Sequence, residues 1–267
     1  MNVHSFCMAG LRQVGSAWAG AVMAVMIATL MAPSGVHAAE VRVAVAANFA
    51  GALKRISQDF ERDTGHRVSA AVGSTGQLES QIRQGAPFAV FLAADDQAPA
   101  RLERAGLAVA GTRLTYAVGR LVLWSAEPGR VDDRGEVLRT GAFDRIAVAN
   151  PKLAPYGAAA LQTLDRMGLR ERLGPKIVEG ANITQTHQFV ASRNAPLGFV
   201  ALSQVMQHGV MESGSAWIVP TSLHAPLAQE AVLLTAGRHN PAASALLAYL
   251  QTERTKGIIR SLGYEVP

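Results

Sequence analysis

The sequence predicts two α/β lobes, each with a mainly parallel sheet flanked by helices. Strand-like and helix-like segments alternate from residue 41 onward, which favours parallel strands with helices on both faces. A second strand–helix series begins near residue 146, and no linker rich in Pro, Gly and Ser separates the two series. The chain is therefore expected to cross between the lobes more than once. We expect lobe 1 at 40–120 plus 224–267 and lobe 2 at 121–223.

The first series contains three predicted strands, each followed by a predicted helix. Apolar runs predict buried strands at 41–46, 68–72 and 88–92. Between the first two strands, Leu53, Ile56 and Phe60 repeat at helical spacing and Gly65 ends the helix. Two shorter helices are expected at 78–84 and from Asp96 through Leu102.

The second half of the chain continues the same alternation. The apolar stretch 114–124 has Gly119 in its middle, which predicts two short strands that meet at a bend. Later strands are expected at 146–149, 177–178, 197–200, 216–219 and 231–234. Helices are expected after Pro155, from about Thr184, over 242–251 and over 255–262.

The N-terminal segment is typical of a secretory signal. Residues 13–39 carry no charge, with Arg12 before them and Glu40 after them. The apolar core of about 16 residues is short for a membrane span and is followed by helix-breaking and small residues. We therefore expect residues 1–39 to be a signal peptide cleaved after Ala38 or Ala39. An N-terminal membrane anchor is the alternative.

Composition excludes several classes of function. The one cysteine, Cys7, lies in the signal segment, so the exported chain can hold neither a zinc–thiolate site nor a cysteine nucleophile. The formal net charge is +5, from 25 Lys and Arg against 20 Asp and Glu. The basic residues are scattered without a run of three, so we do not expect nucleic-acid binding.

Four loops at predicted strand ends share an uncharged hydrogen-bonding chemistry. They are 46–49, 73–77, 150–157 and 180–184, rich in Asn, Ser, Thr, Tyr and backbone N–H groups. In open α/β sheets, ligands sit outside the carboxyl ends of strands and against helix N-termini. The loops together favour an oxyanion held by neutral donors and helix dipoles. Ordinary capping and turn chemistry is the alternative for any one loop.

Other candidate sites are weaker. The histidines of the exported chain are scattered and form no i, i+4 pair, so they do not predict a metal site. Asp95 and Asp96 follow a predicted strand, where helix capping explains them better than a catalytic carboxylate pair. Neither a G-x-S-x-G elbow nor a phosphate-binding P-loop is present. We expect neither enzymatic activity nor a resident cofactor.

The loops resemble those of the periplasmic molybdate-binding proteins of ABC importers. The resemblance covers the chain from residue 41 to residue 267. Its landmarks are the segments 46–49, 73–76, 81–87, 91–95, 150–151, 154–157 and 197–201. The order Gly-Ala-Pro and then Ala-Asp is quite specific to this family. The resemblance implies a type II periplasmic binding protein fold, with the oxyanion in a cleft between the two lobes.

The resemblance also implies which residues contact the anion. The contacts fall on Ala47, Asn48, Ser74, Thr75, Tyr156 and Ile183. It implies Asn48 through side chain and backbone, Thr75 with its neighbouring serine, Tyr156 through hydroxyl or backbone, and Ile183 through its N–H. These groups would bind the oxygens of the anion and would not be direct metal ligands. Ala47 stands where a hydroxyl residue is expected, so only its backbone can contribute.

The function implied by the resemblance is capture of molybdate or tungstate by hinge closure. The partner would be the membrane permease of an ABC transporter, and the protein would act in the periplasm as a monomer. One alternative is a binding protein for another tetrahedral oxyanion, such as sulfate, thiosulfate or phosphate. A more remote alternative is a secreted enzyme on the same fold.

Overall fold

The structure is a computed structural model that describes residues 38–207 and 209–267. The predicted signal segment, including Cys7, lies outside the described residues except for its last two, Ala38 and Ala39. Within the described part of the chain, no helix combines the length and the apolarity needed to cross a bilayer.

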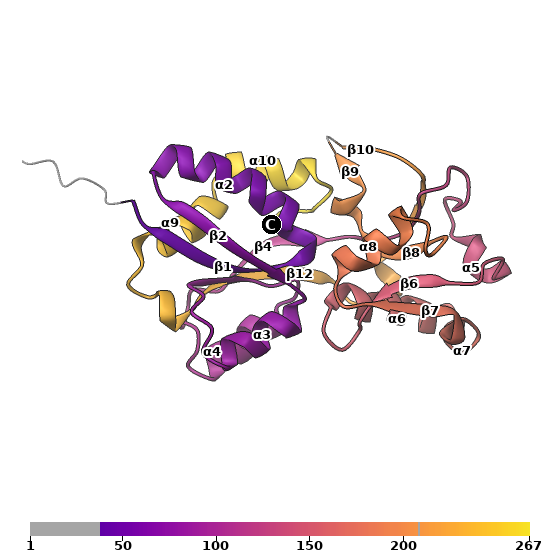
Figure 1. Ribbon diagram of the computed structural model, residues 1–267, viewed down its shortest axis with the longest axis horizontal. Helices are drawn as coiled ribbons and strands as arrows, with labels where there is room; N and C mark the ends of the chain where they lie inside the picture. The colour runs from indigo at the N-terminus through magenta and orange to yellow at the C-terminus, as the bar shows by residue number, and fades with distance from the viewer. Residues whose placement is uncertain (1–37, 208) are drawn as a thin grey trace, which may run out of the picture. The chain divides into compact units, whose positions relative to one another are not determined.

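The first sheet has five strands in the order β2-β1-β3-β12-β4 (Figure 1). β2 and β3 pair with β1 in parallel, whereas β12 runs antiparallel to both β3 and β4. A strand from the end of the chain therefore completes a sheet built by its beginning. The bounds are β1 Glu40–Ala46, β2 Arg67–Gly73, β3 Val90–Leu92, β4 Leu114–Gly119 and β12 Leu227–Leu233.

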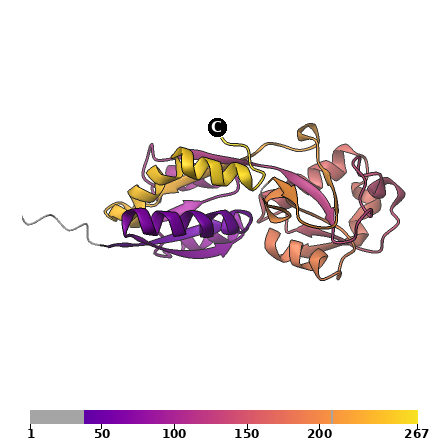
Figure 2. The ribbon, with the colours of Figure 1, turned by 90° about the horizontal axis from the view of Figure 1, so that it is seen from above.

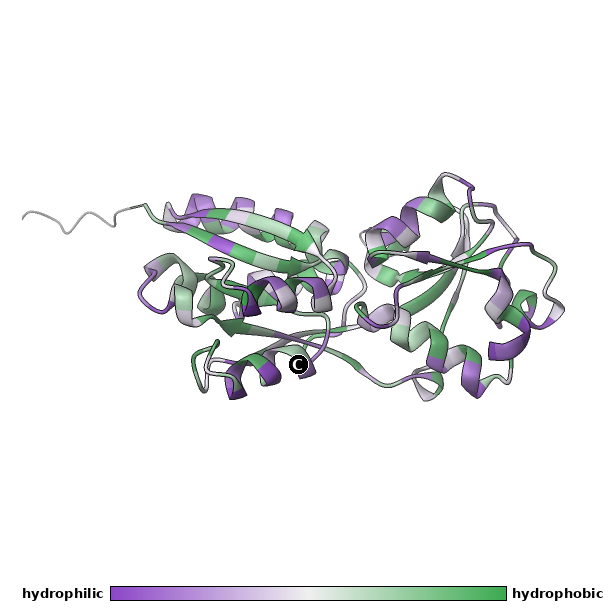
Figure 3. Cartoon of the chain, turned by 60° about the horizontal axis from the view of Figure 1, so that its bottom comes forward, coloured by the Kyte–Doolittle hydropathy of each residue, from purple (hydrophilic) through white to green (hydrophobic). Residues whose placement is uncertain are grey.

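Helices cover both faces of this sheet. Along β1, Val43 and Val45 pack beneath α2, α9 and α10, while Ala44 faces α3 and α4 on the other side. This alternation follows the two-residue period of a strand. Figure 3 shows the strands mostly hydrophobic and the outer faces of the helices hydrophilic. The bounds are α2 Ala50–Thr64, α3 Thr75–Arg83, α4 Gln97–Arg104, α9 Pro241–Leu250 and α10 Glu253–Ser261.

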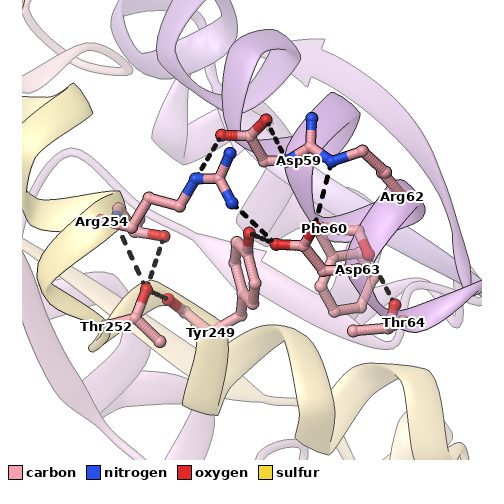
Figure 4. A network of polar contacts seen from close by, with 9 residues as sticks. Asp59, Phe60, Arg62, Asp63, Thr64, Tyr249, Thr252 and Arg254 are labelled. Carbon is pink, nitrogen blue, oxygen red and sulfur yellow. Dashed lines mark hydrogen bonds and ion pairs between the residues drawn. The ribbon is translucent and has the colours of Figure 1, made fainter.

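Polar contacts fix the C-terminal helices to α2 (Figure 4). Arg254 of α10 pairs with Asp59 at 3.0 Å and with Asp63 at 3.1 Å. Tyr249 of α9 donates its hydroxyl to Asp63 Oδ2 at 2.7 Å. These contacts join segments that are about 190 residues apart in the sequence.

The second sheet also has five strands, in the order β11-β5-β8-β6-β7. β6 pairs in parallel with β7 and β8, and β5 runs antiparallel to β8 and β11. The strand bounds are β5 Leu121–Ser125, β6 Ile146–Ala149, β7 Ile177–Gly180, β8 Gly198–Ala201 and β11 Ser215–Ile218. Apolar side chains of α5, α6 and α7 cover one face and those of α8 the other. The helix bounds are α5 Glu136–Thr140, α6 Pro155–Arg166, α7 Arg170–Leu173 and α8 Ile183–Ala191.

The chain crosses between the two sheets twice, as Figure 2 lets the reader follow. The first crossing is at Arg120, between β4 and β5, and the second lies between Ile218 and Leu227. The strand after each crossing starts at the edge where the parallel strands end, so it must run away from that edge. This geometry explains why β5 and β12 are antiparallel in otherwise parallel sheets. The predicted α/β fold with mainly parallel sheets and more than one crossing is confirmed.

Several element boundaries differ from the sequence prediction. α3 starts at Thr75, three residues before the expected start at 78, because its first turn is polar and the apolar period begins at Leu78. β12 starts at Leu227 rather than at 231. Two short helices, α5 and α7, and a hairpin were not predicted. The hairpin strands are β9 Met206–Gln207 and β10 Val210–Met211.

Candidate functional site

A small cavity lies at the carboxyl ends of strands from both sheets. Its volume is about 10 Å³, room for about one water molecule. All six residues that the sequence singled out line it, and their role as ligand contacts stays a prediction. The lining residues are Ala46, Ala47, Asn48, Ser74, Thr75, Ala94, Ala154, Pro155, Tyr156 and Ile183.

Four helical segments begin at this cavity. The 3₁₀ turn Ala47–Phe49 leads into α2, and Ser74, Ala154 and Asn182 are the N-caps of α3, α6 and α8. First-turn N–H groups have no partner within their own helix, and the helix dipole places partial positive charge there. None of the lining residues is charged. The cavity therefore suits an anion that is held by neutral donors.

Thr75 is placed to donate a hydrogen bond into the cavity. Its Oγ1 accepts from the backbone N–H of Ala94 at 3.0 Å, and its side chain is buried. Among the described residues no protein group accepts from this hydroxyl, so its proton is left for a ligand. Ser74 differs, since its hydroxyl donates to Gln77 Oε1 at 2.8 Å in the first turn of α3. Of the two predicted hydroxyl residues, Thr75 is the freer donor.

Asn48 directs its side-chain amide away from the expected ligand contact. Nδ2 donates to Gln229 Oε1 at 2.8 Å and to Tyr264 Oη at 3.1 Å, which uses both amide protons. Tyr264 in turn donates to the backbone oxygen of Asn48 at 2.8 Å. The backbone N–H of Asn48 lies in the turn that opens on the cavity. A ligand contact from the Asn48 side chain requires exchange of one of these bonds.

Tyr156 lies in the first turn of α6 with its hydroxyl in the protein interior. Oη accepts from Gln229 Nε2 at 3.2 Å. Burial raises the pKa of Tyr156 well above its ordinary value, so the hydroxyl is protonated at physiological pH. The residue can offer both this proton and its first-turn N–H.

Ile183 and Ala47 contribute backbone groups. Ile183 is the first residue of α8, after the cap Asn182, whose Oδ1 accepts from Gln185 N at 3.0 Å. The backbone oxygen of Ala47 accepts from Thr184 Oγ1 at 3.3 Å, a contact between the two lobes. Because the side chain of Ala47 is a methyl group, only its main-chain groups can hydrogen-bond to a ligand.

Further contacts join the two lobes around the cavity. Gly76 N donates to Leu153 O at 2.9 Å, and Ser203 Oγ donates to Asn48 O at 3.2 Å. A Cβ at Gly76 would lie 3.1 Å from Leu153 Cα. The absence of a side chain at Gly76 therefore lets the loops of the two lobes meet.

Sequence reasoning missed the polar residues behind the cavity. Gln229, Tyr116 and Tyr264 are buried and bonded to Asn48 or to one another. They belong to no motif, and Tyr264 is 216 residues away from Asn48. One signal was present, because Gln229 is a polar residue inside the apolar strand β12.

Asp95 bonds to the first turn of α4, because its Oδ1 accepts from Ala98 N at 2.8 Å, as expected for a structural role at a helix start. Burial raises the pKa of Asp95 despite this bond. Asp96 is the N-cap residue, but its side chain makes no capping bond. Across residues 38–207 and 209–267, no three His, Cys, Asp or Glu side chains are grouped to hold a metal ion.

Comparison with known families and proteins identifies similar chains. The model of a family described as bacterial extracellular solute-binding protein matches residues 41–265. The molybdate-binding protein ModA of Azotobacter vinelandii is 57% identical over 228 residues, which cover 85% of this chain and 90% of that protein. ModA of Rhodobacter capsulatus is 48% identical over 246 residues, covering 92% and 95%.

Solved structures show the same similarity. A periplasmic molybdate-binding protein of Azotobacter vinelandii superposes with a TM-score of 0.83 and 39% identity, covering 85% of this chain and 99% of that one. A sulfate-binding protein of Mycobacterium tuberculosis has a TM-score of 0.69 over 86% of this chain and 87% of its own. At 13% identity, that second likeness concerns the fold alone.

Proposed function

The chain belongs to the family of bacterial extracellular solute-binding proteins, and we propose that it captures molybdate in the periplasm and delivers it to an ABC transporter. The observation that carries the proposal is the cavity of neutral donors at four helix starts, with no charged residue in its lining. The molybdate-binding proteins that are 57% and 48% identical support the choice of anion. Molybdate is the transported ligand in this proposal and not a resident cofactor.

Binding would proceed by closure of the lobes on the anion. The anion first meets the loops of the first sheet, where Thr75 and the N–H of Asn48 lie, and closure then adds Tyr156 and Ile183. A four-oxygen anion exceeds a cavity of about 10 Å³, so the facing loops must part to admit it. The two crossings between the sheets would serve as the hinge, with lobe boundaries near residues 120 and 223.

Charge compensation would come from partial charges and not from a counter-ion. Each hydrogen bond from a neutral donor to a charged acceptor contributes about 1.5–3 kcal/mol. Four helix starts spread this stabilisation around the anion. Selection against sulfate would rest on cavity size, because both anions are tetrahedral dianions, and tungstate is expected to bind as well.

The remaining features follow from the same role. We propose that residues 1–39 direct export and are removed, and that the protein works as a monomer whose closed form docks on the membrane permease. Binding of another oxyanion, such as sulfate or phosphate, is the rival within the same family. The relatives at 57% and 48% identity are binding proteins and not enzymes, which does not favour the enzymatic alternative.

Thermal unfolding in the presence of different anions tests the proposal. A ligand at a thousandfold excess over its Kd stabilises the folded state by about 4 kcal/mol. Molybdate and tungstate are expected to raise the Tm strongly, and sulfate and phosphate at equal concentration to leave it almost unchanged. If only sulfate or phosphate raised the Tm, the protein would be a binding protein for that anion and not for molybdate.

A further inference from the structure

Gln229 occupies a fully buried position between the two lobes. It lies on β12, between β3 and β4 of the first sheet, and its exposed fraction is 0%. The ladder between β12 and β4 is irregular at this point, since Gln229 pairs with Ala117 but Glu230 pairs with Thr115. Such bulges redirect side chains and are frequent beside functional sites.

The hydrogen bonds of Gln229 reach ligand loops in both lobes. Oε1 accepts from Asn48 Nδ2 at 2.8 Å, in the first lobe. It also lies 3.1 Å from the Tyr116 hydroxyl, which shares its one proton between Gln229 Oε1 and Ala93 O at 2.9 Å. Nε2 donates to Tyr156 Oη at 3.2 Å, in the second lobe. One buried amide therefore connects two residues that line the cavity.

These bonds fix the direction in which Tyr156 can donate. Asn48 Nδ2 has only protons to give, so the atom facing it must be the acceptor Oε1, which leaves Nε2 facing Tyr156. Because Nε2 can only donate, Tyr156 Oη must accept from it, and the tyrosine proton must point elsewhere. An oxyanion only accepts hydrogen bonds, so this arrangement suits it.

Gly119 leaves the space that this contact needs. It ends β4, directly before the crossing into the second lobe. A Cβ at Gly119 would collide with the Tyr156 hydroxyl and would lie 2.6 Å from Gln229 Nε2. A residue without a side chain is therefore needed at Gly119 for Gln229 and Tyr156 to form their hydrogen bond.

We propose that Gln229 is a positioning residue, which sets the Tyr156 hydroxyl as a donor to the bound oxyanion and links it to Asn48. The inference rests on the proposed function and extends it to a residue outside the cavity lining. Gln229 acts through Tyr156 in this account, so the effect of its loss on affinity must depend on the tyrosine hydroxyl.

A double-mutant cycle on molybdate affinity tests this dependence. Kd is measured by calorimetry for the unaltered protein, Gln229→Met, Tyr156→Phe and the double variant. Gln229→Met is expected to weaken binding about tenfold or more alone, and less than about twofold in the Tyr156→Phe background. The control is Ser125→Ala, which removes another buried hydrogen bond, from Ser125 Oγ to Pro196 O at 2.6 Å. It should lower the Tm without changing Kd.

The outcomes separate this inference from the proposed function. Equal weakening by Gln229→Met in both backgrounds, or no weakening in either, overturns the positioning role while molybdate binding stands. Failure of the unaltered protein to bind molybdate overturns the proposed function and this inference with it.

A second variant covers the case in which Gln229→Met does not fold. Gln229→Glu keeps the shape and the acceptor for Asn48, but it replaces the donor to Tyr156 by an acceptor. Binding should weaken tenfold or more, because the tyrosine proton turns inward and a carboxylate opposes the anion. An unchanged Kd in Gln229→Glu overturns the inference.

Discussion

The Thr75 hydroxyl oxygen accepts a hydrogen bond from the backbone N–H of Ala94 at 3.0 Å, at the wall of the cavity. This bond joins the loop after β2 to the loop after β3. It fixes the side chain of Thr75 and leaves its proton free to bind an anion.

Replacing Thr75 should affect both binding and stability. Thr75→Ala removes the donor and leaves the buried N–H of Ala94 without its partner. We expect molybdate to bind tenfold or more weakly, and the free energy of unfolding to fall by about 1–3 kcal/mol. Calorimetry and denaturant unfolding measure the two effects. Thr75→Ser keeps the hydroxyl and serves as the control, so an equal loss of affinity in both variants would refute the role of the hydroxyl.

Asn48→Ala should weaken molybdate binding tenfold or more without unfolding the protein. The substitution removes both donor bonds of Nδ2, so Gln229 and Tyr264 lose a common partner. The free energy of unfolding is expected to decrease by about 1–3 kcal/mol. Asn194→Ala is the matched control, because Asn194 is exposed and bonds only to Ser192 among the described residues. Unchanged affinity in Asn48→Ala would show that the Asn48 side chain does not support binding, and would leave only its backbone N–H as a contact.

Gly76→Ala should hold the two lobes apart. The new Cβ would lie 3.1 Å from Leu153 Cα and 3.3 Å from Leu153 O, both backbone atoms of the facing loop. Closure must then occur against this crowding, and we expect a Kd about tenfold higher with a faster dissociation rate. Stopped-flow kinetics measures that rate.

Gly51→Ala provides the comparison for this prediction. Gly51 lies in α2, and a Cβ there would meet nothing within 4 Å. Affinity should be unchanged, and the helix should gain about 0.5–1 kcal/mol from the replaced glycine. Equal affinities of Gly76→Ala and the unaltered protein would contradict the close approach of the two loops.

The pair of Tyr249 and Asp63 should contribute to the pH dependence of stability. The hydrogen bond from Tyr249, followed by the nearby Arg62 and Arg254, lowers the pKa of Asp63 below its ordinary value of 3.8. Ionised Asp63 therefore stabilises the folded protein above pH 3.8, and this stabilisation is lost as the pH falls through the lowered pKa that Asp63 has in the folded state. Burial and the bond to Asp63 raise the pKa of Tyr249 to about 12, so its contribution is present below pH 10 and is lost as pH rises through 12.

Thermal unfolding across pH tests this pair. In Tyr249→Phe, the Tm should fall less steeply between about pH 5 and pH 2 than in the unaltered protein. Asp133→Asn is the control, since the Asp133 side chain is 94% exposed and should leave the curve unchanged. Superimposable Tm curves for Tyr249→Phe and the unaltered protein would show that the bond has no such effect.

Periodicity was enough to predict the strand–helix alternation, and the family resemblance of the loops was needed to name the six residues that line one cavity. Leu53, Ile56 and Phe60 mark the buried face of α2 because local spacing determines which side of a helix is apolar. The order of strands could not be predicted in this way, since β12 enters between β3 and β4 from the far end of the chain.

The polar groups behind the cavity were equally beyond local reasoning. Gln229 meets Asn48 and Tyr156 across 181 and 73 residues of sequence. Loop chemistry identifies donors near a ligand, but it does not tell which of their protons are already used. Only the tertiary contacts show that both amide protons of Asn48 are already donated to protein groups, whereas the Thr75 hydroxyl is bonded as an acceptor.

Diffraction from crystals grown with molybdate, recorded at the molybdenum absorption edge, would locate the bound anion. We expect one strong anomalous peak in the cavity, with anion oxygens within hydrogen-bonding distance of Thr75 Oγ1 and of the backbone N–H groups of Asn48 and Ile183. A peak elsewhere on the protein, or an empty cavity in crystals saturated with molybdate, would contradict this placement of the anion.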